Sequence, residues 1–317
     1  MEVITMWEDA ATLYFLGVQV YAFGLYAALG MGLAIIVLAL LSRRAKWKAG
    51  TAPLLGFLSL ALGLAFARIF FCLMDRVLGD SMPLWAVVQL NNGGYSLMGA
   101  LAGVCLAAVL TGWMTGQKPA ALLDYLAPAF LLFVACERLG EGYIEGFGLS
   151  RGLTGTLLNG TFLTVQDDYE CWYLATYLVE SFVALVLAVV LLWDLGRARR
   201  AGDTFIKFLL LFGASQIILE SLRYDQHMTV ISFVRLEQVM SMVLLGAGVI
   251  VLAARSWRKR RLLALLALIS VLLATGIGVG IEFMIDRTDV SRYLLYAAFI
   301  LVVSVPACLG LRLRREA

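Results

Sequence analysis

Residues 234–261 read VRLEQVMSMVLLGAGVIVLAARSWRKRR, and this stretch decides the fold class of the chain. Its first part, 234–254, is apolar apart from a few polar residues near its beginning. A helix of about 20 such residues is long enough to cross a bilayer. The run ends at a dense basic cluster, 255–261, which is typical of the cytoplasmic end of a membrane-spanning helix. The stretch therefore predicts a span that ends in the cytoplasm.

The composition of the whole chain places it in the membrane class. Hydrophobic residues make up 62% of its 317 residues and charged residues only 15%, whereas an average soluble domain is roughly 25% charged. The mean hydropathy is +0.90. The five cysteines show no C-x-x-C spacing and no histidine nearby, so we expect neither a disulfide framework nor a metal site.

Nine stretches are long and apolar enough to span a membrane, some of them with polar interruptions. We therefore expect an all-α polytopic membrane protein with a seven-span helical core and two extra C-terminal transmembrane helices. The expected spans are 14–41, 53–75, 96–114, 119–137, 172–193, 204–222, 234–254, 262–282 and 291–311.

Basic residues lie mainly in every second connection between these spans. With the C-terminal tail, those connections hold 17 of the 25 basic residues and three of the 22 acidic residues. Lysine and arginine gather in the cytoplasmic loops of membrane proteins. The pattern therefore predicts a multi-pass protein with its N-terminus outside and its C-terminus in the cytoplasm.

Two features predict how the chain is divided. The long connection 138–171 is rich in Gly, Thr and Asp, and a long loop between tightly connected helices commonly carries function. We expect it to form a head on the outer side of a membrane domain covering 1–255. The basic cluster marks a seam before a two-helix extension, 256–317, which carries charges only at the ends of its spans and from which we expect no chemistry.

Several charged and polar side chains lie within the expected spans or at their edges. Ionisable residues at membrane depth are usually paired, face the interior of a bundle, and often mark function. Each of them could instead be structural; Glu220 and Arg223, for example, could form an ion pair one helical turn apart. As a set they favour a shared polar cavity that opens outward. The set comprises Arg68, Asp124, Glu137, Arg138, Glu141, Glu145, Glu180, Glu220, Arg223, Glu237 and Gln238.

Six segments of the sequence carry a family resemblance. They are ARIFF at 67–71, GGYSLMGALAG at 93–103, DYLAPAFLLFVACERLG at 124–140, TYLVES at 176–181, ESLR at 220–223 and EQVMS at 237–241. Through these segments the chain resembles, over about residues 20–255, the bacterial prolipoprotein diacylglyceryl transferases, as a divergent member. The resemblance implies seven spans, an outside N-terminus and a polar head.

The resemblance implies an activity and a set of partners. The family transfers a diacylglyceryl group from phosphatidylglycerol to a cysteine thiol of a lipoprotein precursor peptide, at the outer side of the cytoplasmic membrane. The expected partners are therefore phosphatidylglycerol, this peptide and the lipid bilayer. We expect no cofactor and no nucleic acid.

The resemblance also suggests roles for individual residues. We expect the catalytic residues to be Arg138, Glu145, Glu220 and Arg223. Arg138 is the first choice for holding the departing phosphate, because a guanidinium pairs two phosphate oxygens and stays protonated. Glu145, Glu141 and, more remotely, His227 are the candidates for the base that takes the thiol proton. The expected substrate-binding residues are Arg68, Tyr95, Ser96, Glu141, Glu180 and Gln238.

Four positions depart from the family pattern. Met98 stands where the family has histidine, Glu141 where it has asparagine, Gln216 where it has arginine, and Phe23 where it has tyrosine. A catalytically inactive or re-purposed relative that binds a phospholipid or a peptide is therefore the alternative prediction. A small transporter would also place charges in a helical bundle, but the sequence has no inverted repeat to support one.

Overall fold

The computed structural model describes residues 12–15, 18–78, 84–89, 93–153, 158–167, 169–197, 200–225 and 230–316. Within these residues, nine helices are long and apolar enough to cross a membrane, with mean hydropathies of 1.7 to 2.6 over their most apolar windows. The strands that the structure describes are short and form three separate two-stranded sheets. The prediction of an all-α polytopic membrane protein is therefore confirmed.

The described residues fall into two compact units. Unit 1 consists of Met1–Arg197 and Arg223–Thr229, and unit 2 of Ala198–Leu222 and Val230–Ala317. The two helices of the expected C-terminal extension belong to unit 2, together with the two helices that precede them. The functional division expected at residue 255 stays a prediction.

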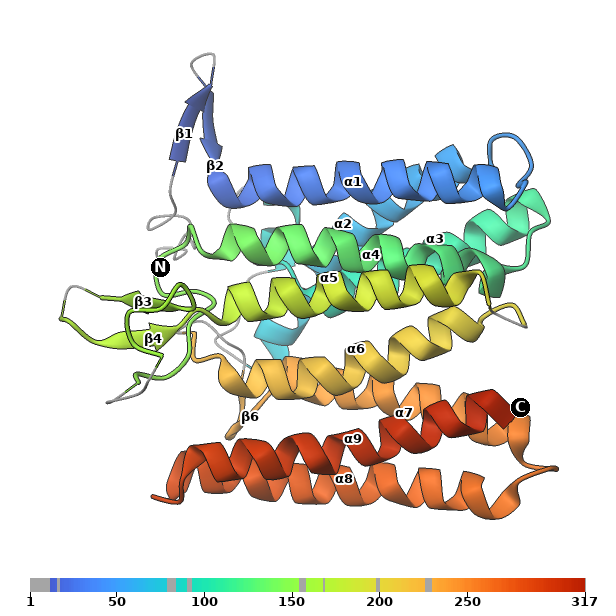
Figure 1. The fold of residues 1–317 in the computed structure, drawn as a ribbon. Helices are drawn as coiled ribbons and strands as arrows, with labels where there is room; N and C mark the ends of the chain where they lie inside the picture. Colours follow the sequence, from blue (N-terminus) through green and yellow to red (C-terminus); the bar gives the residue numbers. More distant parts are fainter. Residues whose placement is uncertain are drawn as a thin grey trace. The chain divides into compact units, whose positions relative to one another are not determined.

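The described residues of unit 1 form five long helices, a short 3-10 helix and two hairpins. Helix α2 packs against α3, α1 against α4, and α4 against α5, as can be followed in Figure 1. The elements are β1 (Thr12–Phe15), β2 (Val18–Tyr21), α1 (Ala22–Arg44), α2 (Thr51–Leu78), η1 (Leu84–Val88), α3 (Leu97–Thr115), α4 (Pro119–Glu141), β3 (Thr164–Gln166), β4 (Trp172–Leu174) and α5 (Thr176–Leu195).

Two glycines allow these helix pairs to lie close together. A Cβ atom at Gly99 of α3 would clash with the backbone of α2 around Phe66, and one at Gly30 of α1 would meet Phe133 O of α4 at 2.9 Å. Small residues at such crossings let two helix backbones approach each other closely. In a membrane this close packing favours helix association, because lipid tails are as apolar as the side chains and the hydrophobic effect does not drive the helices together. The glycines thus fix α1 and α2 against their neighbours.

In unit 2, the part of the chain that the structure describes is a bundle of four helices with one small hairpin. Its buried core draws on all four helices and includes Leu210, Leu245, Ala267 and Phe299. Helices α8 and α9 run side by side (Figure 1). The elements are α6 (Asp203–Leu222), β5 (Val230–Ile231), β6 (Val234–Arg235), α7 (Leu236–Ser256), α8 (Arg261–Arg287) and α9 (Arg292–Glu316).

Three expected boundaries were wrong. The first span begins at Ala22 and not at residue 14, because 12–15 and 18–21 pair as antiparallel strands. Helix α4 continues to Glu141, so the first residues of the expected head, 138–171, lie in its last turn. Helix α8 continues to Arg287, which places Glu282 inside the helix.

Candidate functional site

The last turn of α4 carries a buried arginine with several acidic neighbours. Arg138 is 5% exposed and forms an ion pair with Glu141, one turn further along the same helix. Its Nε atom lies 2.8 Å from Glu180 Oε2 of α5 and 3.7 Å from Glu137 Oε2. A cation is also favoured in this last turn by the helix dipole. Arg138 therefore joins α4 to α5 through charge.

A second arginine, Arg223, reaches the same carboxylates from a distant part of the sequence. Its Nη2 atom lies 3.2 Å from Glu141 Oε2, and its Nη1 atom lies 3.5 Å from Glu180 Oε2. Its Nε atom donates to Asp225 Oδ2 at 3.0 Å. Asp225 was missed in the sequence because it lies in a polar loop, and its only signal is its position two residues after Arg223. We call these residues the arginine–carboxylate cluster: Glu137, Arg138, Glu141, Glu180, Arg223 and Asp225.

The segment that follows α4 holds Arg223 in position. Ser150 and Arg223 form an isolated antiparallel bridge, and the Tyr224 amide donates to Leu149 O at 2.8 Å. The Leu149 amide donates to Asp225 Oδ1 at 3.4 Å. The same segment is tied to the β3–β4 hairpin, since Ser150 N donates to Leu174 O. Residues 149–150 of the expected head region therefore hold the backbone around Arg223 in place.

The charges of the cluster are almost completely buried and are not equal in number. Its two guanidinium groups face four carboxylates, and the side chains of Arg138, Glu141, Glu180, Arg223 and Asp225 are at most 8% exposed. Charges interact strongly where water is excluded. Both guanidinium groups of the cluster are therefore already paired with carboxylates.

Arg68 of α2 holds a backbone loop. The residue is 1% exposed and donates to Ala86 O at 2.7 Å, to Gly94 O at 3.0 Å and to Gly93 O. Gly94 has φ = +75°, and a Cβ atom there would overlap the ring of Phe71. Glycine is therefore required at this turn, and Arg68 fixes the backbone that leads into α3.

Tyr95, Ser96 and Met98 follow this turn and lie around the start of α3. Ser96 is the N-cap of α3, where its Oγ accepts a hydrogen bond from Gly99 N at 3.3 Å. Tyr95 lies with its ring 5.8 Å from the Arg68 guanidinium. Burial raises the pKa of Tyr95 above its usual value, although the charge of Arg68 opposes this, so its hydroxyl stays protonated at neutral pH. Met98, at the family's histidine position, is buried in the first turn of α3.

Two further groups lie at the end of α4. Glu145 is exposed in the turn that follows the helix. The hydroxyls of Tyr26 and Tyr143 are 3.1 Å apart, and their rings stack with centroids 5.2 Å apart. Tyr143 was missed in the sequence, where it reads as an ordinary loop aromatic. His227, the remote candidate base, lies outside the described residues.

The remaining candidates, Glu220 and Gln238, lie in unit 2. The backbone carbonyl of Glu220 accepts a hydrogen bond from Arg235. The amide of Gln238 donates to Ile217 O at 3.2 Å and to Glu282 Oε1 at 2.6 Å, and its oxygen accepts from Arg235 N at 3.0 Å. Glu282 was expected at the end of the span 262–282, but α8 continues to Arg287, so this carboxylate lies within the helix. Through these hydrogen bonds, Gln238 of α7 links its own helix to α6 and α8.

A comparison with protein families identifies the group to which the chain is related. The family model described as prolipoprotein diacylglyceryl transferase matches residues 11–254, well over half of the sequence. The chain belongs to the prolipoprotein diacylglyceryl transferase family. The resemblance inferred from the six sequence segments is therefore confirmed. Within the family match lie α1 to α6 and most of α7, whereas α8 and α9 lie beyond it.

Individual members of this transferase family are similar at low identity. The chain is 27% identical over 209 residues to the phosphatidylglycerol–prolipoprotein diacylglyceryl transferase of Staphylococcus xylosus, covering 64% of this chain and 74% of that protein. It is 24% identical over 247 residues to the enzyme of the same name from Staphylococcus saprophyticus, covering 75% and 86%. These values are those of a divergent member of the family.

Proposed function

We propose that this multi-pass membrane protein transfers a diacylglyceryl group from phosphatidylglycerol to the cysteine thiol of a lipoprotein precursor. The proposed place of the reaction is the outer side of the bacterial cytoplasmic membrane. The observation that carries the proposal is the sharing of Glu141 and Glu180 by Arg138 and Arg223 in a buried cluster. The whole cluster lies within the family match.

The proposed reaction exchanges one bond to carbon for another. The cysteine sulfur attacks the carbon of the diacylglyceryl group that is bonded to a phosphate oxygen of phosphatidylglycerol. A C–S bond forms, and the C–O bond between that carbon and the phosphate oxygen breaks. Glycerol phosphate leaves with the electron pair of the broken bond. The thiol proton passes to a base, because the thiolate is the nucleophile and a free cysteine has a pKa of about 8.5.

We assign the two arginines to the leaving phosphate. Arg138 and Arg223 each present a planar guanidinium that can pair with two phosphate oxygens. Their donors are held apart by Glu141, which contacts both of them. A phosphate that displaces Glu141 would find two fixed cations where its negative charge develops, and fixed charges of this kind supply a large part of catalysis in many enzymes.

The same displacement would make Glu141 available as a base. Glu145, exposed just beyond α4, is the second candidate. We assign Glu180 to holding both arginines and Arg68 to positioning the loop that carries Tyr95, whose protonated hydroxyl could donate to the lipid headgroup.

The orientation of the chain belongs to the proposal and has its own test. Cys171 is exposed in the turn between β3 and β4. If this hairpin faces outward, a membrane-impermeant maleimide will label Cys171 in intact cells, and the Cys171→Ala variant will lose that label. Labelling of Cys171 only after the cells are broken would reverse the proposed orientation.

The activity is tested with purified protein in phosphatidylglycerol vesicles and a precursor peptide with one cysteine. We expect the peptide to gain the mass of one diacylglyceryl group, and vesicles of phosphatidylcholine to give no product. The replacement of the family's histidine by Met98 favours the second candidate function, a relative that binds phospholipid or peptide without transfer. Peptide or lipid binding with no thioether product would select that second function.

A further inference from the structure

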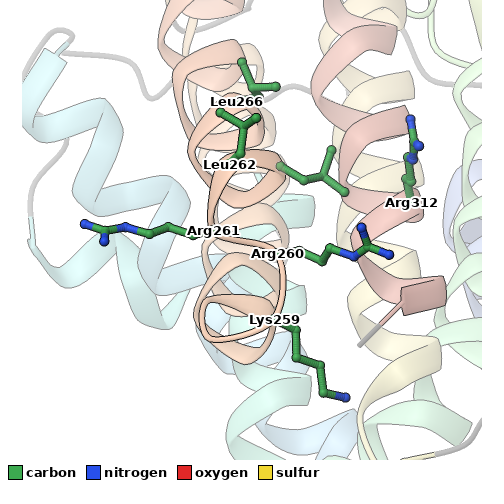
Figure 2. Close-up of a pocket in the computed structure, with 7 residues that line it drawn as sticks. Lys259, Arg260, Arg261, Leu262, Leu266 and Arg312 are labelled. Carbon is green, nitrogen blue, oxygen red and sulfur yellow. The ribbon is translucent and has the colours of Figure 1, made fainter.

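A pocket in unit 2 lies where α8 begins and α9 ends. Its volume is about 360 Å³, and it is lined by Lys259, Arg260, Arg261, Leu262, Leu263, Leu266 and Arg312. Figure 2 shows Arg260 extending from the start of α8 toward Arg312 on α9. Arg260 and Arg312 come from the start of α8 and the end of α9, and both line the pocket.

The charged residues that the structure describes in the lining of this pocket are all cationic. Four of the seven described lining residues carry a positive charge and none of the seven is acidic. Arg255, a few residues earlier, lies 3.0 Å from Asp203 and does not belong to the lining. Positive charges held close together repel one another, and an anion bound between them lowers that free energy. The pocket therefore fits a ligand with a negative charge.

The rest of the lining is apolar and faces outward. Leu262 is 72% exposed and Leu266 is 48% exposed, and they lie one turn apart on α8 (Figure 2). Leucines exposed on a membrane-spanning helix face the acyl chains of lipids. The lining thus has cations at the start of α8 and leucines further along the same helix. This arrangement matches a ligand with a negatively charged head and an apolar tail.

We propose that this pocket binds an anionic phospholipid of the surrounding leaflet. Its phosphate lies between Arg260 and Arg312 with Lys259 nearby, and an acyl chain runs along Leu262 and Leu266. Basic pockets between transmembrane helices are a recurring way of binding lipid headgroups, and arginine pairs two phosphate oxygens at once. The positive charge of the loops predicts that this leaflet is the cytoplasmic one.

The site is independent of the proposed reaction. It shares no residue with the arginine–carboxylate cluster, and its helices lie beyond the family match. Its role would be to anchor α8 and α9 to the bilayer. A soluble phosphate would interact with the arginines but not with the two exposed leucines, so the leucines favour a lipid as the occupant.

The test uses the full-length protein in neutral detergent and phosphatidic acid as the probe, followed by native mass spectrometry. The variant is Arg260→Gln/Arg312→Gln. Its matched control is Arg258→Gln/Arg315→Gln, which removes the same charge from the same stretches but changes no lining residue. We expect the pocket variant to weaken binding roughly 30-fold and the control less than about threefold.

Two matched ligands distinguish a phospholipid from a soluble phosphate compound as the occupant of the pocket. Diacylglycerol, which has the chains without the phosphate, and glycerol phosphate, which has the phosphate without the chains, should each bind far more weakly. Equal losses in the two double variants would show diffuse attraction by a basic surface and overturn the site. Tight binding of glycerol phosphate would overturn a lipid as the occupant.

A measurement on the unaltered protein guards against a folding defect in the variant. Phosphatidic acid with a photoreactive group in its acyl chain should cross-link to the first two turns of α8. Cross-links spread evenly over the lipid-facing helices, with no enrichment around Leu262 and Leu266, would overturn the proposal.

Discussion

Arg138 Nε and Arg223 Nη1 approach the same oxygen atom, Glu180 Oε2, at 2.8 Å and 3.5 Å. Two cations so close together in a buried site require several carboxylates around them, and Glu141 and Asp225 supply them. The arrangement binds α4, α5 and the segment after α6 into one charged unit. It also places two phosphate-binding side chains next to each other.

Glu180 should be the most sensitive carboxylate of the cluster. We expect Glu180→Gln to lower the free energy of unfolding by about 3 kcal/mol, because it removes one of the two carboxylates that both buried guanidinium groups contact, and the one that is completely buried. Glu137→Gln is the matched control, since Glu137 is the more exposed residue and lies 3.7 Å from Arg138; it should cost less than about 1 kcal/mol. Thermal unfolding in detergent measures both. Equal shifts would contradict this role of Glu180.

Gly94 should not tolerate a side chain. Gly94→Ala adds a Cβ atom at φ = +75° against the ring of Phe71, and we expect a loss of stability of about 2 kcal/mol or more. Gly32→Ala, at a helical glycine with open space around its Cβ position, should be neutral or slightly stabilising. Thermal unfolding of the two variants measures the difference, and an unchanged Gly94→Ala protein would show that the turn can be rebuilt.

The helical spans were predictable from the sequence, and their ends less so. Hydropathy located all of the long helices that the structure describes, because a bilayer demands long apolar runs. It could not separate the β1–β2 hairpin from α1, because apolar and aromatic residues suit both strands and membrane helices. The end of α8 was missed because Glu282 reads as the polar end of the expected span 262–282, whereas the structure buries it in a helix that continues to Arg287.

The partners of the candidate residues were only partly predictable. Pairing of Arg138 with acidic residues follows from the cost of a lone charge at membrane depth. The role of Arg68 did not follow, because its partners are the carbonyls of Ala86, Gly93 and Gly94, and a backbone carbonyl leaves no mark in a sequence. Asp225 was missed because its importance depends on a chain reversal that brings Arg223 back to α4.

Gln238 and Glu282 should be energetically coupled. We expect a double-mutant cycle of Gln238→Ala and Glu282→Ala to give a coupling free energy of about 1 to 2 kcal/mol, because each single change leaves the other buried polar group without its 2.6 Å partner. Glu237→Ala with Glu282→Ala is the control pair and should be additive. Additivity of the Gln238 pair would contradict a link between α7 and α8 through these side chains.

The turn of the β3–β4 hairpin should depend on pH through Asp167. Burial alone would raise the pKa of Asp167, but hydrogen bonds from Cys171 N, the Tyr173 hydroxyl and Tyr169 N outweigh it and lower the pKa below 3.8. The stability that Asp167 contributes is therefore complete above pH 3.8 and is lost as the pH falls through its lowered pKa in the folded hairpin.

NMR titration of the Tyr169 and Cys171 amides measures this loss. Both signals should shift together below pH 3.8 in the unaltered protein and stay constant in Asp167→Asn. A midpoint at or above 3.8 would contradict the prediction.

Diacylglyceryl transfer by Arg138→Gln, compared with Arg151→Gln, tests the central claim most directly. Arg151 lies close to the cluster in sequence, but its guanidinium stacks over Tyr224 at 4.5 Å, so it controls for the loss of a nearby charge. With a cysteine peptide and phosphatidylglycerol vesicles, we predict that Arg138→Gln lowers the rate of thioether formation at least about 100-fold and that Arg151→Gln stays within about threefold of the unaltered protein. Equal rates for all three proteins would contradict the assignment of Arg138 to the leaving phosphate.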